Sequence, residues 1–146
     1  MSETNTSSAI TPPPLNFALG YLLLRLATGV NFLMHGAVRI FGDLGGFAEY
    51  IKGEFAGKLP EFLLVPYAYA LTFAELILGA MVLLGFRSRE ALVGLGLVLS
   101  TLILGSCLNA MWSAVHSQML HTLVVAFLLY RIADDRFSVD RCVFGR

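Results

Sequence analysis

Long apolar runs, each interrupted by a few polar positions, dominate the pattern of this chain. Four runs are long enough to cross a bilayer as helices, because about 20 residues at ~1.5 Å each cover a hydrocarbon core of roughly 30 Å. We place these spans at residues 15–41, 62–85, 90–111 and 113–132. The pattern therefore predicts an all-α fold, an integral membrane four-helix bundle whose transmembrane domain covers residues 15–133.

The first span carries a polar stripe. At about 100° per residue, its polar and small residues fall within one arc of roughly 120°, and the opposite face is Leu, Ala, Val and Phe. The members of this stripe are Arg25, Thr28, Gly29, Phe32, His35, Gly36 and Arg39. A membrane helix must turn such a stripe toward protein or water. We therefore expect this helix to pack against the other three.

Three segments outside the spans differ from them in composition. Residues 1–14 are polar and then proline-rich, which predicts a disordered N-terminal tail. Residues 47–59 predict a short interfacial amphipathic helix between the first two spans, with a plain anchoring role or a role in lateral access of a lipid-soluble ligand. Residues 134–146 are polar and are expected to form a C-terminal cytoplasmic tail.

The distribution of charge predicts how the protein is oriented in the membrane. Only 14% of the residues are charged and the mean hydropathy is +0.75, so the expected surroundings are the lipid bilayer. A net charge of zero gives no case for a nucleic-acid partner. Four spans put both termini on one side of the membrane. The arginines on that side outnumber the basic residues on the other side, which are Arg39, Lys52 and Lys58. The positive-inside rule then predicts a multi-pass protein of the cytoplasmic (inner) membrane with both termini cytoplasmic.

Arg25 and Glu75 are the charges expected deepest in the membrane. Counting residues from the predicted helix ends places each about 15 Å from the same membrane surface, on antiparallel helices. Each charge alone is costly in lipid, whereas a hydrogen-bonded pair is tolerable. We predict a buried ion pair between Arg25 and Glu75, which either fixes the helix register or provides a proton or ligand contact in the core.

A second set of polar side chains gathers at the opposite ends of the spans, beneath the predicted amphipathic helix. Imidazole suits hydrogen bonding to a quinone carbonyl and proton exchange near neutral pH. The candidate ligand-binding residues are Asn31, His35, Arg39, Asn109, Trp112, His116 and His121. The alternative for each is an ordinary interfacial or capping role, and Tyr67 and Tyr69 are assigned only as interface anchors.

Metal and covalent cofactors have little support in the sequence. His116 and His121 are five positions apart, or roughly 140° around a helix, so they cannot share a metal on one face. A bis-histidine haem between His35 and His121 is disfavoured for want of any further motif. The two cysteines are far apart and form no CxxC. We predict no metal site and no covalent cofactor.

Several of these residues together form a family pattern. The quoted elements are Arg25-x3-Gly29 followed by Phe32, His35-Gly36 and Arg39, then Glu75-x3-Gly79 with Leu84-Gly85-Phe86, and finally Phe137-Ser138-x-Asp140. Over residues 17–141 the chain resembles the DoxX/DoxD family of small four-helix membrane proteins. That family includes a subunit of thiosulfate:quinone oxidoreductase. The resemblance therefore implies a quinone ligand and a redox partner protein, without making this chain an enzyme by itself.

The sequence thus favours a quinone-interacting subunit of a membrane-bound oxidoreductase. His35 and His121 would contact the quinone head group, and a partner protein would carry the primary redox centre. Two alternatives stay open: a non-catalytic membrane anchor or assembly factor for a redox partner, and a carrier of a small hydrophobic or thiol compound. A homo-oligomer is a further alternative for the partner.

Overall fold

Four long helices make up most of the protein. The computed structural model describes residues 15–144, and its long helices are α1 (Leu15–Phe41), α3 (Glu61–Leu84), α4 (Ser88–Leu108) and α5 (Trp112–Tyr130). All four are long and apolar enough to cross a membrane. The predicted all-α membrane bundle is confirmed, and each helix begins and ends within three residues of its expected span. The predicted N-terminal tail, 1–14, lies outside the described residues.

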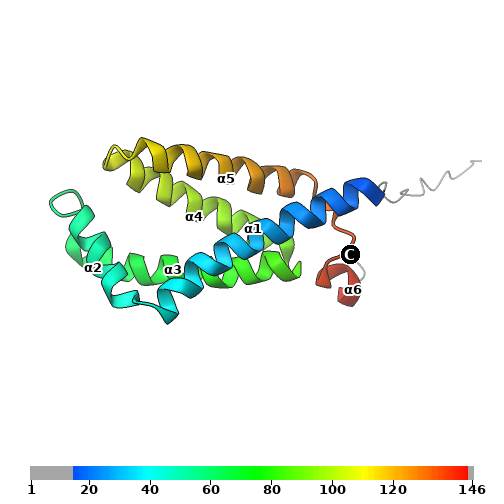
Figure 1. Ribbon diagram of the computed structural model, residues 1–146, viewed down its shortest axis with the longest axis horizontal. Helices are drawn as coiled ribbons and strands as arrows, with labels where there is room; N and C mark the ends of the chain where they lie inside the picture. The colour runs from blue at the N-terminus through cyan, green and yellow to red at the C-terminus, as the bar shows by residue number, and fades with distance from the viewer. Residues whose placement is uncertain (1–14, 145–146) are drawn as a thin grey trace, which may run out of the picture.

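The long helices pack mainly as two pairs, α1 with α3 and α4 with α5, and α3 also packs against α4 (Figure 1). The short helix α2 (Leu44–Glu54) packs on α3 at one end of the bundle, which we call the α2 end. The opposite end holds the start of α1 and the C-terminal helix α6 (Val139–Phe144), and we call it the terminal end. A short turn, η1 (Ile132–Asp134), connects α5 to this region.

Glycines bring the backbones of α1 and α3 into direct contact. A Cβ on Gly29 would lie 2.6 Å from the Leu83 Cα, and a Cβ on Gly36 would lie 2.7 Å from the Leu76 nitrogen. A Cβ on Gly79 would overlap the Leu33 backbone in the same way. Such close approach lets membrane helices associate without a hydrophobic driving force. These contacts fix an antiparallel register in which the numbers of facing residues add to 112.

Two apolar clusters fill the bundle. The larger one joins all four long helices and centres on Val82, Leu92, Leu95, Leu99 and Leu128. The smaller one lies at the α2 end, where Ala48 and Ile51 of α2 pack on Leu64 and Ala68 of α3. The amphipathic helix expected at residues 47–59 corresponds to α2, which begins three residues and ends five residues earlier than predicted, and its buried face lies on α3. This packing places α2 beside the pocket described below.

Candidate ligand pocket and polar clusters

Glu75 lies within α3 with 2% of its surface exposed. It forms an ion pair with Arg39 of α1, which donates a hydrogen bond to the Glu75 Oε2. The Arg39 guanidinium also lies over the ring of Phe47 in α2, with its Cζ 4.1 Å from the ring centroid. Arg39 therefore links α1 to both α3 and α2.

The predicted ion pair between Arg25 and Glu75 is wrong. In the register set by the glycines, Arg25 faces position 87, which is about 12 residues or roughly 18 Å along the helix from Glu75. The estimate of depth assumed that α1 and α3 end level with each other. In the structure α1 instead extends beyond the last turn of α3 at the terminal end. Arg25 consequently lies beside the turn between α3 and α4.

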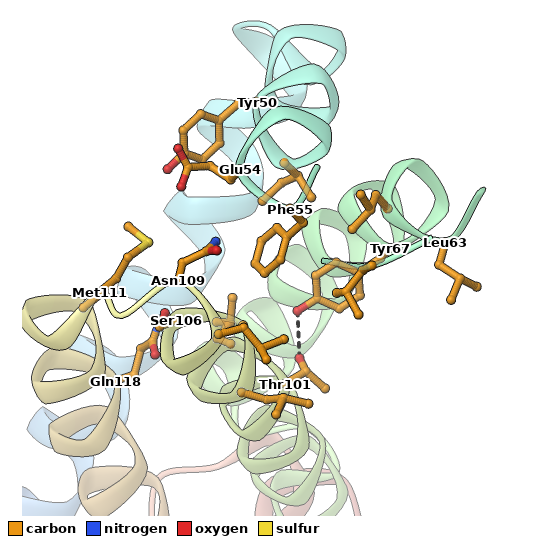
Figure 2. Close-up of a pocket in the computed structure, with 18 residues that line it drawn as sticks. Tyr50, Glu54, Phe55, Leu63, Tyr67, Thr101, Ser106, Asn109, Met111 and Gln118 are labelled. Carbon is orange, nitrogen blue, oxygen red and sulfur yellow. Dashed lines mark hydrogen bonds between the residues drawn. The ribbon is translucent and has the colours of Figure 1, made fainter. Parts of the chain in front are cut away.

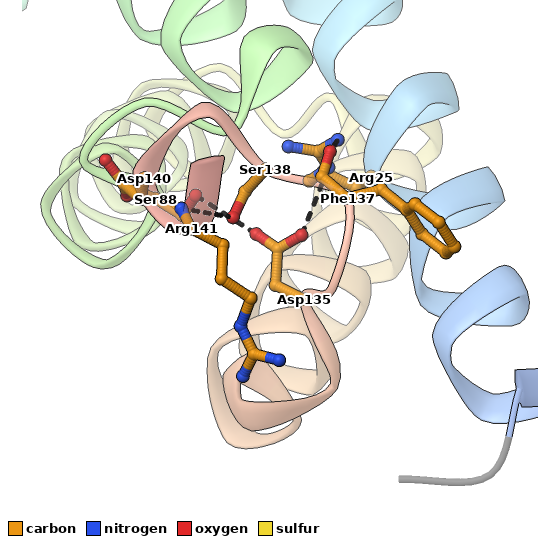
Figure 3. A network of polar contacts seen from close by, with 7 residues as sticks. All are labelled: Arg25, Ser88, Asp135, Phe137, Ser138, Asp140 and Arg141. Atoms are coloured by element: carbon orange, nitrogen blue, oxygen red, sulfur yellow. Dashed lines mark hydrogen bonds and ion pairs between the residues drawn. The ribbon is translucent and has the colours of Figure 1, made fainter. Parts of the chain in front are cut away.

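The partners of Arg25 come from the C-terminal segment (Figure 3). Its Nη2 donates to the carbonyl oxygen of Phe137 at 3.0 Å, and its Nε lies 3.8 Å from the Asp135 Oδ1. The Ser88 hydroxyl donates to the other Asp135 oxygen at 3.2 Å. Burial raises the pKa of Asp135 above its ordinary value, while the Arg25 charge and the Ser88 hydrogen bond lower it. Arg25 is 3% exposed, so this segment seals it from solvent.

Asp140 caps the start of α4. Its two carboxylate oxygens accept hydrogen bonds from the backbone amides of Arg87 at 2.8 Å and Ser88 at 3.0 Å. Its own amide donates to the Gly85 carbonyl at 3.1 Å. Gly85 has a φ of +68°, and a Cβ there would overlap the Arg25 guanidinium. We refer to Arg25, Gly85, Ser88, Asp135 and Asp140 as the C-terminal clamp.

A polar hollow of about 350 Å³ adjoins the clamp at the terminal end. Its walls include Ser88, Asp135 and Asp140 of the clamp together with the side chains of Arg89 and Arg141. Across residues 15–144, no group of three His, Cys, Asp or Glu side chains is arranged to hold a metal ion. The hollow therefore offers hydrogen bonds and charge, with no preformed metal centre.

The histidine cluster predicted from the sequence is only partly assembled. His121 Nδ1 contacts the Ser117 carbonyl at 2.7 Å, so this nitrogen carries the hydrogen and donates it. Its Nε2 then accepts from the Asn31 Nδ2 at 3.1 Å. The ring packs edge-on against Phe32, with centroids 5.9 Å apart. His35 Nδ1 donates to the Asn31 carbonyl at 2.8 Å, and its side chain is exposed. This group joins α1 to α5.

The other predicted ligand residues lie elsewhere. Arg39 is engaged with Glu75, and Trp112 and His116 are exposed on α5. Asn109, just after α4, accepts a hydrogen bond from the Lys58 ammonium through its Oδ1. The candidate residues are therefore divided among separate places, and one of them, Asn109, lines the pocket at the α2 end.

A pocket of about 530 Å³ lies at the α2 end, between α2, α3, α4 and the start of α5 (Figure 2). This volume is typical of sites for small molecules. The walls are mostly apolar, with Ile51 and Phe55 from the α2 side, Leu64 from α3 and Leu102 from α4. Its polar lining residues are Tyr50, Glu54, Tyr67, Thr101, Ser106, Asn109 and Gln118. An apolar cavity with a few polar groups suits a lipophilic molecule that carries a small polar head.

The polar groups of the pocket form two connected pairs. The Tyr67 hydroxyl of α3 lies 2.9 Å from the Thr101 hydroxyl of α4, and Figure 2 shows the two pointing toward each other. The Gln118 Nε2 of α5 donates to the Ser106 hydroxyl of α4 at 2.9 Å. Beside them, Lys58 donates to the Leu108 carbonyl at 3.2 Å and ties the α2–α3 loop to the end of α4.

Sequence reasoning missed Tyr67 and Thr101 as pocket residues. Tyr67 was assigned as an interface anchor, because a tyrosine near a span end usually has that role. A usable signal existed on α4, where Thr101, Gly105 and Asn109 recur every four residues and so share one face. That face lines the pocket.

Residues 20–116 match the family model described as DoxX. No curated protein and no solved structure matches this chain.

Proposed function

The chain belongs to the DoxX family, and from this premise we propose that it is a quinone-interacting subunit of a membrane-bound oxidoreductase. The quinone binds in the pocket at the α2 end, and a partner protein supplies the primary redox centre. The protein lies in the cytoplasmic membrane with both termini in the cytoplasm, as the distribution of arginines favours.

The observation that carries this proposal is the pocket itself. It lies among membrane-spanning helices, and several residues of its lining also face outward along the spans. Leu104, for example, is 63% exposed, and Leu63 and Leu108 are exposed beside it. A lipophilic molecule dissolved in the bilayer therefore reaches the pocket sideways without crossing water. The volume of about 530 Å³ accommodates a quinone ring and the first part of its tail.

The charged residues have a positioning role in this proposal. Arg39 and Glu75 do not line the pocket, but Arg39 contacts Phe47 of α2 and so holds α2 against the long helices. Because α2 supplies one wall, this contact fixes the shape of the pocket. Of the ligand residues predicted from the sequence, Asn109 lines this pocket.

A pocket-filling substitution tests the proposal. Ala114 lines the pocket on α5, whereas Ala126 on the same helix is exposed outside it. We expect Ala114→Phe to weaken the binding of a short-tailed quinone at least about tenfold, since the added ring occupies the cavity. Ala126→Phe is the matched control and should bind as the parent does. Binding is measured by isothermal titration calorimetry on purified protein in detergent, and equal affinity of the two variants would contradict the proposed site.

A companion variant separates the pocket from the histidine group. His35 is exposed on α1 and does not line the pocket, so His35→Ala should leave quinone affinity unchanged. If His35→Ala weakens binding while Ala114→Phe does not, the quinone binds between α1 and α5 instead. Circular dichroism confirms in each case that the helices are intact.

The internal pairing of charges also favours a second candidate function, that of a non-catalytic anchor for a redox partner. Arg39 is paired with Glu75 and Arg25 with Asp135, as expected where charges serve packing. In that case a partner protein co-purifies in mild detergent although no quinone binds. Quinone binding that Ala114→Phe removes would argue against this candidate.

A further inference from the structure

We propose that the pocket binds the reduced quinol more tightly than the oxidised quinone, and that the Tyr67 hydroxyl sets this preference. The inference rests on the proposed function, because it concerns which redox form of the ligand the same pocket holds.

The direction of one hydrogen bond is fixed by its neighbour. The Thr101 hydroxyl lies 2.7 Å from the carbonyl oxygen of Val98, which can only accept. A hydroxyl has one hydrogen, so Thr101 commits it to Val98. In the 2.9 Å contact between Tyr67 and Thr101, the hydrogen must then come from Tyr67. The Tyr67 oxygen is left with its lone pairs, and it presents an acceptor to the pocket.

The other polar groups of the pocket either accept or do not discriminate. The Glu54 carboxylate is an acceptor. The free amide atoms, Asn109 Nδ2 and Gln118 Oε1, are covered by neighbouring atoms and cannot reach a ligand. The Tyr50 hydroxyl can rotate to serve either form. The Ser106 hydroxyl accepts from Gln118 and keeps one hydrogen, which the oxygens of either form can accept. Tyr67 and Glu54 therefore decide the balance, and both favour a ligand that donates.

Quinone and quinol differ in this property. The oxygens of a quinone are carbonyls, which only accept hydrogen bonds, whereas the hydroxyls of a quinol also donate. At Tyr67 a quinol forms a hydrogen bond, while a quinone would place one acceptor against another. One neutral hydrogen bond corresponds to a preference of about fivefold. The same preference raises the midpoint potential of a bound two-electron quinone couple by about 20 mV.

The experiment measures both redox forms against one set of variants. A short-tailed naphthoquinone and its chemically reduced quinol are titrated under argon into purified protein, and heats of binding give each Kd. The parent protein should bind the quinol about fivefold more tightly. Tyr67→Phe should reduce this preference, leaving only the part that the Glu54 carboxylate contributes. Tyr69→Phe, on the same helix but outside the pocket, should keep the preference.

A second variant should reduce the preference for quinol by changing the direction in which Tyr67 donates its hydrogen. Thr101→Val keeps the shape of the side chain but removes the acceptor of the Tyr67 hydrogen. Tyr67 can then donate to a ligand, so quinone affinity should rise and the preference should shrink. A purely structural role for these two hydroxyls would weaken both redox forms alike. If Tyr67→Phe fails to fold, Thr101→Val still decides the question.

The outcomes distinguish this inference from the function on which it rests. Equal affinities in the parent protein, or tighter quinone binding, would overturn the preference while leaving a quinone site in place. Binding of neither form would overturn the proposed function itself. A preference that stays unchanged in both Tyr67→Phe and Thr101→Val would remove the role assigned to Tyr67.

Discussion

Arg39 of α1 and Glu75 of α3 form an ion pair in which the two partners differ in burial. Glu75 is 2% exposed, whereas Arg39 is 20% exposed and also covers the ring of Phe47. Glu75 is therefore the more deeply buried of the two partners. Arg39 lies in the last turn of α1, near the α2 end. Removing Arg39 should therefore affect Glu75 differently from the way in which removing Glu75 affects Arg39.

Removing Arg39 should destabilise the protein more than removing Glu75. Arg39→Leu leaves a buried carboxylate without a partner, at a cost of about 3 kcal/mol. After Glu75→Leu, the long Arg39 side chain can extend toward the membrane boundary, so the loss should be smaller. The double variant should recover much of the stability. The measurement is reversible unfolding in mixed detergent micelles, and strictly additive effects would show that the two residues do not interact.

The glycine contacts between α1 and α3 give a prediction about packing. Gly79→Ala places a methyl group in the Leu33 backbone, so the helices must separate, and we expect a loss of about 2 kcal/mol. Gly20→Ala is the matched control, because no atom lies within 4 Å of the added Cβ. That variant should be neutral or slightly stabilising, since alanine favours helix. The same unfolding assay compares the two, and equal effects would exclude the proposed register contact.

Asp140 should stabilise the start of α4 from the far end of the chain. Asp140→Ala removes the cap on the amides of Arg87 and Ser88, with an expected loss of about 1–2 kcal/mol. The C-terminal segment should also become sensitive to protease. Asp43 is a matched control, since it caps α2 through the Gly46 amide at 2.7 Å. Asp43→Ala should leave cleavage of the C-terminal segment at the parent rate, whereas faster cleavage there would contradict a local role for each cap.

The pKa of Asp135 predicts a pH dependence of the clamp. Burial raises this pKa above the ordinary value of 3.8 that the unfolded chain retains, so the folded state binds the proton more tightly. The resulting stabilisation is fully present below pH 3.8 and is lost as the pH rises through the folded pKa. Asp135→Asn should remove this component. The difference in Tm between parent and variant, followed from acid to neutral pH, checks the sign, and parallel curves would contradict it.

The boundaries of the four long helices were predictable because they depend on local pattern. Apolar runs of sufficient length predicted the spans, and the breakers Gly42 and Pro60 lie outside the helices on each side of α2. The family was recognisable from short motifs. Those around Arg25 and Glu75 lie within α1 and α3, whereas Gly85-Phe86 and Phe137-Ser138 lie in the connecting segments. The match over residues 20–116 confirms that interpretation.

The charge pairing was not predictable from depth alone. Counting residues from the helix ends required those ends to be level, and the extension of α1 past α3 breaks that assumption. Gly29, Gly36 and Gly79 did carry the information, because backbone contacts between them and α1 or α3 fix the register. With that register, Arg39 faces the region of Glu75 and Arg25 faces the turn after α3.

The pocket and the clamp depend on contacts between distant residues. The amphipathic pattern predicts a helix between the first two spans, but it does not indicate that this helix packs on α3 and forms a wall of the pocket with Tyr67 and Thr101. The C-terminal segment looked like a polar tail because its buried residues, such as Asp135 and Ser138, are themselves polar. Their burial became visible only when Arg25 and the start of α4 were placed beside them.

Asp140 lies 53 positions after the Arg87 amide that it holds. During synthesis, the helical hairpin of α3 and α4 is therefore complete before the carboxylate that caps α4 has been made. Translation of the final residues supplies Asp140, which caps the start of α4. A nascent chain that ends before residue 135 would carry all four long helices, with the amides at the start of α4 still uncapped.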